Sequence, residues 1–355
     1  MNKYAERINR LRAKFEDSGI EALYINSVAN VSYFTGKKGN DCSLYITADE
    51  AWIITDFRYE ELAQSMSEWL SFYETGAGRN TLSFIESREE RKIGIERSYL
   101  PLDLWLRFTA IEGKEFIPVH GLVEKLRDVK DAEELELIAR AAKIGCETFD
   151  YILGFIKPGM TEKELATEIE YQMKKRGAEG LSFDTIAISG AKTSMPHGVP
   201  SDKKIETGDF VTMDYGCLYG GYCSDMTRTV AVGQPTQEMK DVYNIVLKAQ
   251  LNACEKIHAG LTGIECDALA RDVIAEAGYG DRFGHSLGHG VGLFIHEGPS
   301  FNQRYDAPIP ADSVVSIEPG IYLPGKFGVR IEDLAIIKES GIINLVDSKK
   351  ELIIL

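Results

Sequence analysis

Two acidic residues in the second half of the chain have a spacing that could pair their carboxylates. Asp214 and Asp225 each lie in a short segment of β-strand composition. If these segments form an antiparallel hairpin that turns at Tyr219 and Gly220, the two carboxylates face each other across it. Directly opposed carboxylates repel each other, and burial would raise the pKa of one of them strongly. A bound divalent cation would remove this cost.

Glu318 and Glu332 repeat this arrangement further along the chain. They lie in strand-like segments separated by a Pro-Gly turn, and a mirror centred on Gly325 places them opposite each other. The acidic pairs stand among Val, Ile and Met, so a solvated charged surface explains them poorly. Four carboxylates with one imidazole favour Mn²⁺, Co²⁺, Fe²⁺ or Zn²⁺. This set exceeds what one catalytic ion with a bound water needs, and it suits two ions about 3.5–4 Å apart.

The imidazole could come from a cluster of histidines. Three of the six histidines of the chain are close in sequence: His285, His289 and His296. Glycines between them argue against a helix and favour a strand or a glycine-rich loop, where backbone can approach a bound group closely. The HExxH motif of the zincins is absent from the sequence.

Five segments that contain these residues resemble the metallopeptidase family of the pita-bread fold, which includes methionine aminopeptidases, aminopeptidase P and prolidase. In chain order they are FVTMDYG (210–216), YCSDMTRT (222–229), HSLGHGVGLFIHE (285–297), VVSIEPGIY (314–322) and GVRIEDLAII (328–337). The resemblance implies five metal ligands: Asp214, Asp225, His289, Glu318 and Glu332. It implies two divalent metal ions as cofactors, with Mn²⁺ expected first and Co²⁺, Fe²⁺ or Zn²⁺ as alternatives.

The same resemblance assigns roles around the metals. Residues 182–198 resemble the strand of the family that carries an active-site histidine, here His197. Glu318 would move a proton from the attacking water to the leaving nitrogen, and His296 would help to stabilise the oxyanion. His197 and His285 would lie around the leaving residue.

Residues beside the ligands are expected to support them. Arg330 shares a strand face with Glu332 and resembles the family's arginine that orients a ligand or neutralises excess carboxylate. We expect a similar supporting role for Tyr215. For Tyr215, and for Thr227 as a further candidate, packing within the strand is an equal alternative.

The N-terminal third narrows the expected activity. Residues VSYFTG (31–36) and TDFRY (55–59) resemble the creatinase-type N-terminal domain of the branch that cleaves Xaa-Pro bonds. The resemblance implies an Xaa-Pro aminopeptidase or dipeptidase that acts on peptides with proline at the second position, as a homodimer. The choice between the two depends on whether residues near 36–40 and 298–306, or a partner's N-terminal domain, block longer substrates.

Three other functions stay open. A methionine aminopeptidase would lack the extra N-terminal domain, and a metal-free, creatinase-like hydrolase would replace the ligands. A non-catalytic pita-bread module that binds peptides, histones or nucleic acid would also lose ligands, whereas this chain keeps all five.

The elements that must position these residues fall into two expected domains. Residues 1–127 alternate strand and helix patterns, and we expect a creatinase-like α/β fold. Its expected strands cover 22–26, 42–47, 51–55, 92–96 and 115–119, and its expected helices about 3–18, 57–70 and 100–111. Residues 128–355 are expected to form an α+β pita-bread catalytic domain.

An internal repeat indicates two related halves in the second domain. Long helical patterns over about 132–156 and 237–257 are each followed by a Gly-apolar-Thr sequence, a second helix and strand signals. Thr161 and Thr262 mark the repeat, and Thr161 with Glu164 forms a capping-box pattern. We therefore expect internal pseudo-twofold symmetry with a cleft between the halves.

Composition limits the remaining function classes. The 355 residues include 40 Lys+Arg and 55 Asp+Glu, a net charge of −15, which argues against a nucleic-acid partner. No apolar run approaches the roughly 18–20 residues that span a bilayer. The amphipathic N-terminus lacks the apolar core of a signal peptide, and the six cysteines form no CxxC motif. We expect a cytoplasmic protein with no membrane partner.

Overall fold

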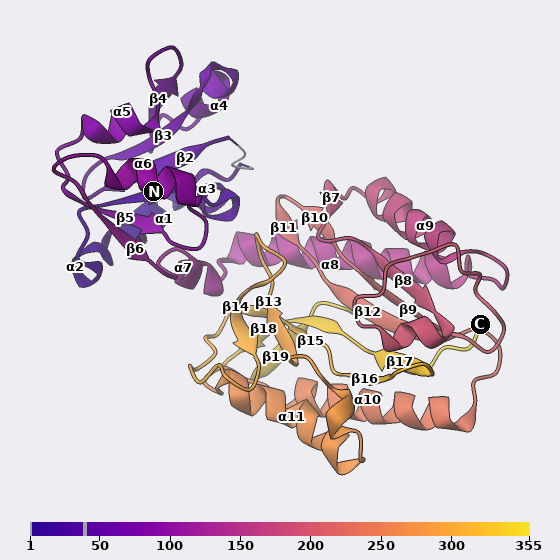
Figure 1. Cartoon of the computed structure of the whole chain (residues 1–355). Coiled ribbons are helices and arrows are strands. Elements are labelled where there is room, and N and C mark those ends of the chain that lie inside the picture. Colours follow the sequence, from indigo (N-terminus) through magenta and orange to yellow (C-terminus); the bar gives the residue numbers. More distant parts are fainter. Residues whose placement is uncertain (1, 38–40) are drawn as a thin grey trace. The chain divides into compact units, whose positions relative to one another are not determined.

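The computed structural model describes residues 2–37 and 41–355, which form two compact units (Figure 1). One unit extends to Arg127, and the other begins at Asp128. Residues 38–40, which belong to the segment expected to limit substrate length, lie outside the described residues.

The N-terminal unit is an α/β domain built on a six-stranded sheet with the order β4-β3-β2-β1-β5-β6. Its strands are β1 (Ala22–Ile25), β2 (Ser43–Thr47), β3 (Ala51–Asp56), β4 (Ser71–Thr75), β5 (Lys92–Glu96) and β6 (Glu115–Val119). Its helices are α1 (Lys3–Arg12), α2 (Phe15–Ser18), α3 (Val28–Thr35), the 3₁₀ helix η1 (Phe57–Tyr59), α4 (Glu60–Gln64), α5 (Thr81–Glu86) and α6 (Leu102–Thr109), and α7 (Glu124–Asp128) ends at the boundary.

The five expected strands of this unit are confirmed. Four elements were not expected: strand β4 and helices α3, α5 and α7. Six of the eight residues of α3 are buried, so it has no polar face and shows no helical periodicity in the sequence. The helix expected over 57–70 is shorter: α4 ends at Gln64, where the Ser65 hydroxyl donates to the Leu62 carbonyl.

The second unit contains two helix pairs with antiparallel strands between them (Figure 1). The pairs are α8 (Ala132–Leu153) with α9 (Glu162–Lys175), and α10 (Gln237–Lys256) with α11 (Gly263–Glu276). Two 3₁₀ helices, η2 (Gly190–Ser194) and η3 (Gly280–Arg282), complete the helical part. Each pair packs on its own apolar core, one with Ile138 and Met213 and the other with Val246 and Val315.

The strands of this unit form four small sheets, with the orders β12-β9-β8, β14-β13-β15-β18-β19, β16-β17 and β11-β10-β7. Their bounds are β7 (Gly180–Leu181), β8 (Ile186–Ser189), β9 (Phe210–Tyr215), β10 (Cys217–Tyr219), β11 (Tyr222–Cys223), β12 (Met226–Ala231), β13 (Gly288–Gly290), β14 (Glu297–Phe301), β15 (Val314–Ile317), β16 (Gly320–Leu323), β17 (Phe327–Arg330), β18 (Asp333–Lys338) and β19 (Gly341–Asn344). None of the helices within residues 2–37 and 41–355 combines the length and apolar composition of a membrane span.

The two halves of the second unit repeat in backbone detail, which confirms the expected internal symmetry. Thr161 caps α9 and Thr262 caps α11, and each forms a capping box with the glutamate three residues later, Glu164 or Glu265. Each threonine also forms an isolated β-bridge with a later segment of its own half. The repeat therefore includes the capped start of the second helix in each half and the later segment that pairs with the capping threonine.

The register of the first acidic hairpin differs from the predicted one by two residues. Thr227, and not Asp225, lies opposite Asp214 in the β9–β12 ladder, and the turn is at Gly220-Gly221. These glycines have φ values of 58° and 80°. A two-residue hairpin turn of this kind needs positive φ at both positions, which glycine adopts without strain. Because side chains alternate with a period of two, the shift leaves both aspartates on the same face.

The second acidic hairpin has the predicted register. Gly320 pairs with Arg330, as a mirror centred on Gly325 requires, so Glu318 lies opposite Glu332. The two glutamates occupy short breaks, one between β15 and β16 and the other between β17 and β18. The hairpin passes from one sheet to the next at these breaks.

Candidate active site

A cavity of about 530 Å³ in the second unit collects the residues that the sequence predicts to do chemistry. All five expected metal ligands line it, together with the expected supporting arginine and the three expected catalytic histidines: Asp214, Asp225, His289, Glu318, Glu332, Arg330, His197, His285 and His296. The lining also includes apolar side chains, among them Phe183, Ile186 and Ile295.

Tight backbone packing fixes the position of His289, the middle residue of β13. A Cβ atom at Gly288 would lie 1.8 Å from the Ser316 carbonyl oxygen, and one at Gly290 would lie 2.0 Å from the Gly298 carbonyl oxygen. No side chain fits at either distance, so glycine on both sides of His289 lets β13 sit closely between β14 and β15.

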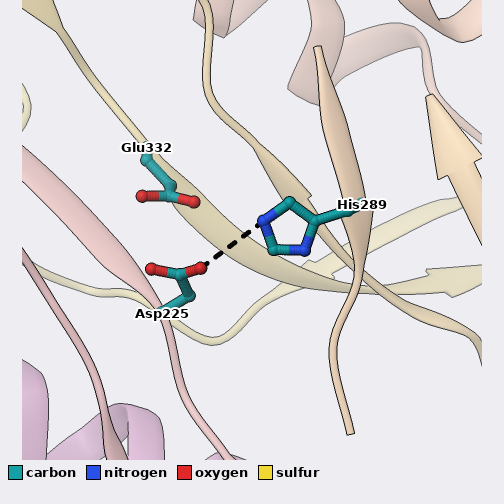
Figure 2. Close-up of side chains that lie close together, drawn as sticks. All are labelled: Asp225, His289 and Glu332. Carbon is teal, nitrogen blue, oxygen red and sulfur yellow. Dashed lines mark ion pairs between the residues drawn. The ribbon is translucent and has the colours of Figure 1, made fainter. Parts of the chain in front are cut away.

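Three of the expected ligands form the tightest group. One potential ligand atom each from Asp225, His289 and Glu332 lies within 4.8 Å of the others. Figure 2 shows both carboxylates beside the imidazole, and His289 Nε2 is 3.6 Å from Asp225 Oδ2. The same nitrogen is 3.4 Å from Glu318 Oε1. Side chains from both halves of the unit therefore meet at one point.

The hydrogen bonds of His289 identify the nitrogen that faces these carboxylates. Its Nδ1 lies 3.1 Å from the Gly290 carbonyl oxygen. A carbonyl only accepts, so Nδ1 carries the proton. Burial lowers the pKa of His289, which keeps the ring neutral and leaves Nε2 with a free lone pair. A lone pair that points at carboxylate oxygens is a suitable arrangement for a cation between them.

Burial and mutual repulsion raise the pKa values of three of these carboxyl groups. For Asp225, burial is the largest cause, and the charges of Asp214 and Glu318 add to it. For Glu332, burial again comes first, followed by the charge of Asp225. The pKa of Glu318 rises to about 7, mainly through burial, although the Arg330 guanidinium opposes the rise. These three carboxyl groups thus resist ionising together unless positive charge joins them.

Unsatisfied oxygens point to the same requirement. Asp214 Oδ1 and Asp225 Oδ1 are buried and have no hydrogen-bond partner among the described residues. A buried acceptor without a partner is costly, and a divalent cation would satisfy both oxygens and the Nε2 lone pair of His289. The residues present therefore fit a site for divalent metal ions.

Arg330 and Thr227 link the acidic residues of the two hairpins. The Arg330 guanidinium forms an ion pair with Asp214, and its Nε donates to the Thr227 hydroxyl at 3.0 Å. That hydroxyl donates in turn to Glu332 Oε2 at 2.7 Å. Thr227 is the residue opposite Asp214 in the observed register, so the correct register would have identified it from the sequence.

Tyr215 does not have the supporting role that was expected of it. The residue is fully buried, and its hydroxyl donates to the Gly145 carbonyl of α8 at 3.2 Å. Because Tyr215 follows Asp214 in the same strand, its side chain points to the opposite face. Tyr215 is a core residue of the strand, and Thr227 is the residue that contacts a ligand.

Tyr322, which the sequence analysis did not identify, fixes the orientation of His285. The Tyr322 oxygen accepts from Arg330 Nη1 at 2.9 Å, so its own proton points to His285 Nε2 at 2.8 Å. His285 Nδ1 donates to the Ser286 carbonyl at 2.8 Å. Burial, with Arg330 as a second cause, lowers the pKa of His285 to about 4. Tyr322 and Arg330 are diagonal neighbours in the β16–β17 register. The predicted register of this hairpin could therefore have identified Tyr322 from the sequence.

The other two histidines are exposed on the cavity wall. The ring centroid of His296 is 4.3 Å from that of His289. Burial and the neighbouring His289 lower the pKa of His296, so a neutral ring lies beside the expected ligand. His197 lies on the loop after η2 and also lines the cavity. Both side chains can reach a molecule bound there.

Comparison with known proteins agrees with this geometry. Residues 136–339 match metallopeptidase family M24, and residues 7–129 match the creatinase/prolidase N-terminal domain. The chain is 45% identical to the uncharacterized peptidase YqhT of Bacillus subtilis (strain 168), over 98% of this chain and 100% of that protein.

Solved structures of similar proteins cover the chain almost completely. An Xaa-Pro dipeptidase from Bacillus anthracis has a TM-score of 0.96 and 44% identity, and the match covers 99% of this chain and 100% of that one. An X-Pro aminopeptidase from Thermotoga maritima MSB8 has a TM-score of 0.88 and 39% identity, with 95% and 98% covered. The chain therefore belongs to metallopeptidase family M24 and carries an N-terminal domain of the creatinase/prolidase type.

Proposed function

We propose that this protein is a dinuclear-metal exopeptidase that hydrolyses the bond between an N-terminal residue and a following proline, in dipeptides or in longer peptides. One observation carries the proposal. Four carboxylates and the Nε2 lone pair of His289 converge on one cavity, and two of the buried carboxylate oxygens lack a partner within the described residues. The names of the similar Bacillus anthracis and Thermotoga maritima proteins support the substrate class.

The metal ligands in this proposal are Asp214, Asp225, His289, Glu318 and Glu332. Oxygen ligands with one imidazole suit Mn²⁺ first, with Co²⁺, Fe²⁺ and Zn²⁺ as alternatives. When bound, two such ions supply Lewis acidity toward the substrate carbonyl and a water with a pKa lowered toward neutrality. Arg330 and Thr227 hold Asp214 and Glu332 in place.

Glu318 is the residue that moves the proton in the proposed reaction. Its carboxyl group lines the cavity, with Oε1 3.4 Å from His289 Nε2, so it lies where it can accept a proton and return it. It would take a proton from the attacking water and deliver it to the proline nitrogen that leaves. His296 would donate a hydrogen bond to the substrate carbonyl oxygen as negative charge develops. His197 and His285, which line the same cavity, would lie around the leaving residue.

The acidic and the apolar residues of the cavity suit the two ends of the scissile bond. The carboxylates attract the ammonium group of an N-terminal residue, which favours exopeptidase action. The apolar side chains of Phe183, Ile186 and Ile295 provide a surface for a proline ring. We further propose a cytoplasmic protein without nucleic-acid or membrane partners, supported by the net charge of −15 and six free cysteines. We propose a homodimer from the resemblance to the family alone.

An assay with two substrates tests the proposal. An Xaa-Pro dipeptide and an Xaa-Pro-Xaa tripeptide are offered to chelated protein and again after Mn²⁺, Co²⁺, Fe²⁺ or Zn²⁺ is added, with Xaa-Ala peptides as controls. We expect metal-dependent turnover of the proline peptides. Cleavage of the tripeptide alone would favour an aminopeptidase, and cleavage of the dipeptide alone a dipeptidase. If neither peptide were cleaved with any of the four metals, a non-catalytic peptide- or histone-binding module would replace the proposal.

A further inference from the structure

A buried carboxylate outside the cavity holds the chain segment that carries His197. Glu162 is the first residue of α9, and its side chain is 0% exposed. Glutamate is rarely buried to this extent, because a buried charge is costly unless hydrogen bonds and an opposite charge compensate it. The partners of Glu162 therefore indicate what it does.

Both oxygens of Glu162 are engaged. Oε1 accepts from the Ser189 amide at 2.8 Å and from the Ser189 hydroxyl at 3.2 Å. Oε2 accepts from Lys192 Nζ at 2.8 Å, and from the Ser201 amide and hydroxyl at 3.0 Å and 2.8 Å. Burial opposes ionisation, but Lys192 and the hydrogen bonds from Ser201 and Ser189 outweigh it and lower the pKa of Glu162. The side chain is an ionised carboxylate with five donors.

These donors stand at the two ends of one loop, residues 190–201, which we name the His197 loop. Ser189 and Lys192 lie at its start, and Ser201 is its last residue. Lys192 Nζ also donates to the Ser201 hydroxyl at 2.9 Å. One carboxylate and one ammonium group therefore tie the start of the loop to its end.

The middle of the His197 loop lines the cavity, and its backbone is held beside His197, where the Pro196 carbonyl accepts from Arg330 Nη1 at 3.4 Å and Gly198 is buried. Met195 and Val199 are 55% and 74% exposed. The His197 imidazole is exposed too, and it forms no hydrogen bond with another residue in the described parts of the chain. The position of His197 therefore depends on the backbone of the loop, which Glu162 holds at both ends and Arg330 contacts at Pro196.

The other half of the domain shows that a helix of this kind does not need the glutamate. Helix α11 is the counterpart of α9 and starts with the same capping box, but its first residue is Gly263. Gly263 follows Thr262 as Glu162 follows Thr161, so the two positions correspond. At the position of Glu162 the counterpart helix therefore has no carboxylate, and the capping box alone starts that helix.

We infer that Glu162 is a positioning residue that closes the His197 loop and thereby holds His197 at the cavity wall for contact with substrate. This inference rests on the proposed peptidase function, which provides the substrate. A catalytic or binding group that is displaced even slightly loses much of its effect. Loss of the closure should therefore weaken the contribution of His197 and leave the metal ligands, which lie on other elements, in place.

A double-mutant cycle in the full-length, Mn²⁺-reconstituted protein tests this inference. Glu162→Gln keeps the size of the side chain but removes the charge that pairs with Lys192. We expect kcat/KM for an Xaa-Pro dipeptide to fall about tenfold or more, with an unchanged number of bound metal ions. In a His197→Ala background, the same substitution should change kcat/KM less than about twofold. An equal fall in both backgrounds would overturn the inference, because Glu162 would then act through the fold as a whole.

A second measurement does not depend on activity. Hydrogen exchange of peptides that cover 190–204 should be faster in Glu162→Gln than in the wild type, with 285–297 unchanged. The matched control is Glu164→Gln in the same helix, which alters the exposed capping carboxylate and should change neither kcat/KM nor exchange in the loop. Unchanged exchange in Glu162→Gln would overturn the inference. Absence of turnover by the wild type would instead refute the proposed function alone.

A milder variant covers the case in which Glu162→Gln does not fold. Ser201→Ala removes the hydroxyl that bonds Glu162 and Lys192 but leaves the ion pair intact. Ser201→Ala then replaces Glu162→Gln in the double-mutant cycle. We expect it to lower kcat/KM in the wild-type background, by less than Glu162→Gln, and to change kcat/KM little in the His197→Ala background. If Ser201→Ala lowered kcat/KM equally with and without His197, the inference would fail.

Discussion

Thr227 offers a sharp test of how the expected metal ligands are held. It is fully buried, and its hydroxyl bonds Glu332 Oε2 at 2.7 Å and Arg330 Nε at 3.0 Å. Thr227→Val removes both hydrogen bonds and leaves the Arg330 Nε–H without this acceptor, at a cost of about 1–3 kcal/mol in the free energy of unfolding. Because Glu332 loses the contact that orients it, we expect the Mn²⁺ affinity to fall about 10–100-fold.

Calorimetric titration of chelated protein with Mn²⁺ measures this affinity, and thermal unfolding measures the stability. The matched control is Thr212→Val in the same pair of strands, since the Thr212 hydroxyl bonds Thr229 at 3.0 Å rather than an expected ligand. The control should lose stability but keep the Mn²⁺ affinity of the wild type. Wild-type affinity in Thr227→Val, or an equal loss of affinity in both variants, would refute the view that Thr227 orients Glu332.

Three further predictions concern the metals, pH and the core behind the site. Asp225→Asn and Glu332→Gln should each lower metal content and turnover together, by elemental analysis and kinetics; normal activity in either variant would contradict their role as ligands. In metal-free protein, the raised carboxyl pKa values mean that the folded state keeps protons that the unfolded chain releases above about pH 4. This contribution lowers the unfolding free energy as the pH rises from about 4 toward the Glu318 pKa of about 7, whereas the lowered pKa values of His285, His289 and His296 act in the opposite direction. The carboxyl contribution is therefore measured against Glu318→Gln, in which the melting temperature of chelated protein should fall less, or rise more, across this window than in the wild type. The same pH dependence in both proteins would disprove it. Arg228→Met removes one partner of a buried ion pair and should cost about 3–5 kcal/mol in chemical denaturation, whereas Lys326→Met at an exposed pair should cost less than about 1 kcal/mol. An equal loss of unfolding free energy in both variants would show that burial does not increase the cost of breaking an ion pair in this protein.

The acidic pairs could be predicted from the sequence because turn chemistry and strand alternation constrain them strongly. The Pro-Gly turn beside Gly325 has one plausible centre, and the predicted mirror is the observed one. In the first hairpin, Tyr219-Gly220 and Gly220-Gly221 are both candidate turns, and only positive φ at both positions selects the second. The resulting error of two residues left Asp214 on the correct face, so the expected ligand set survived it.

The register error also prevented a correct prediction of the contacts between the paired strands. A two-residue error hides the residue opposite Asp214, so Thr227 and Tyr215 could not be told apart as supporting residues. Glu162 was hidden differently: a glutamate in the first turn of a helix is usually explained by the helix dipole. Its burial and its five donors depend on a loop that folds back onto the helix. No local sequence pattern predicts this contact.

Diffraction from crystals of active, Mn²⁺-reconstituted protein at the manganese absorption edge tests the central claim most directly. The account predicts two anomalous peaks about 3.5–4 Å apart, enclosed by Asp214, Asp225, His289, Glu318 and Glu332. A single peak, or peaks away from these five side chains, in crystals of enzyme that cleaves Xaa-Pro peptides would contradict it.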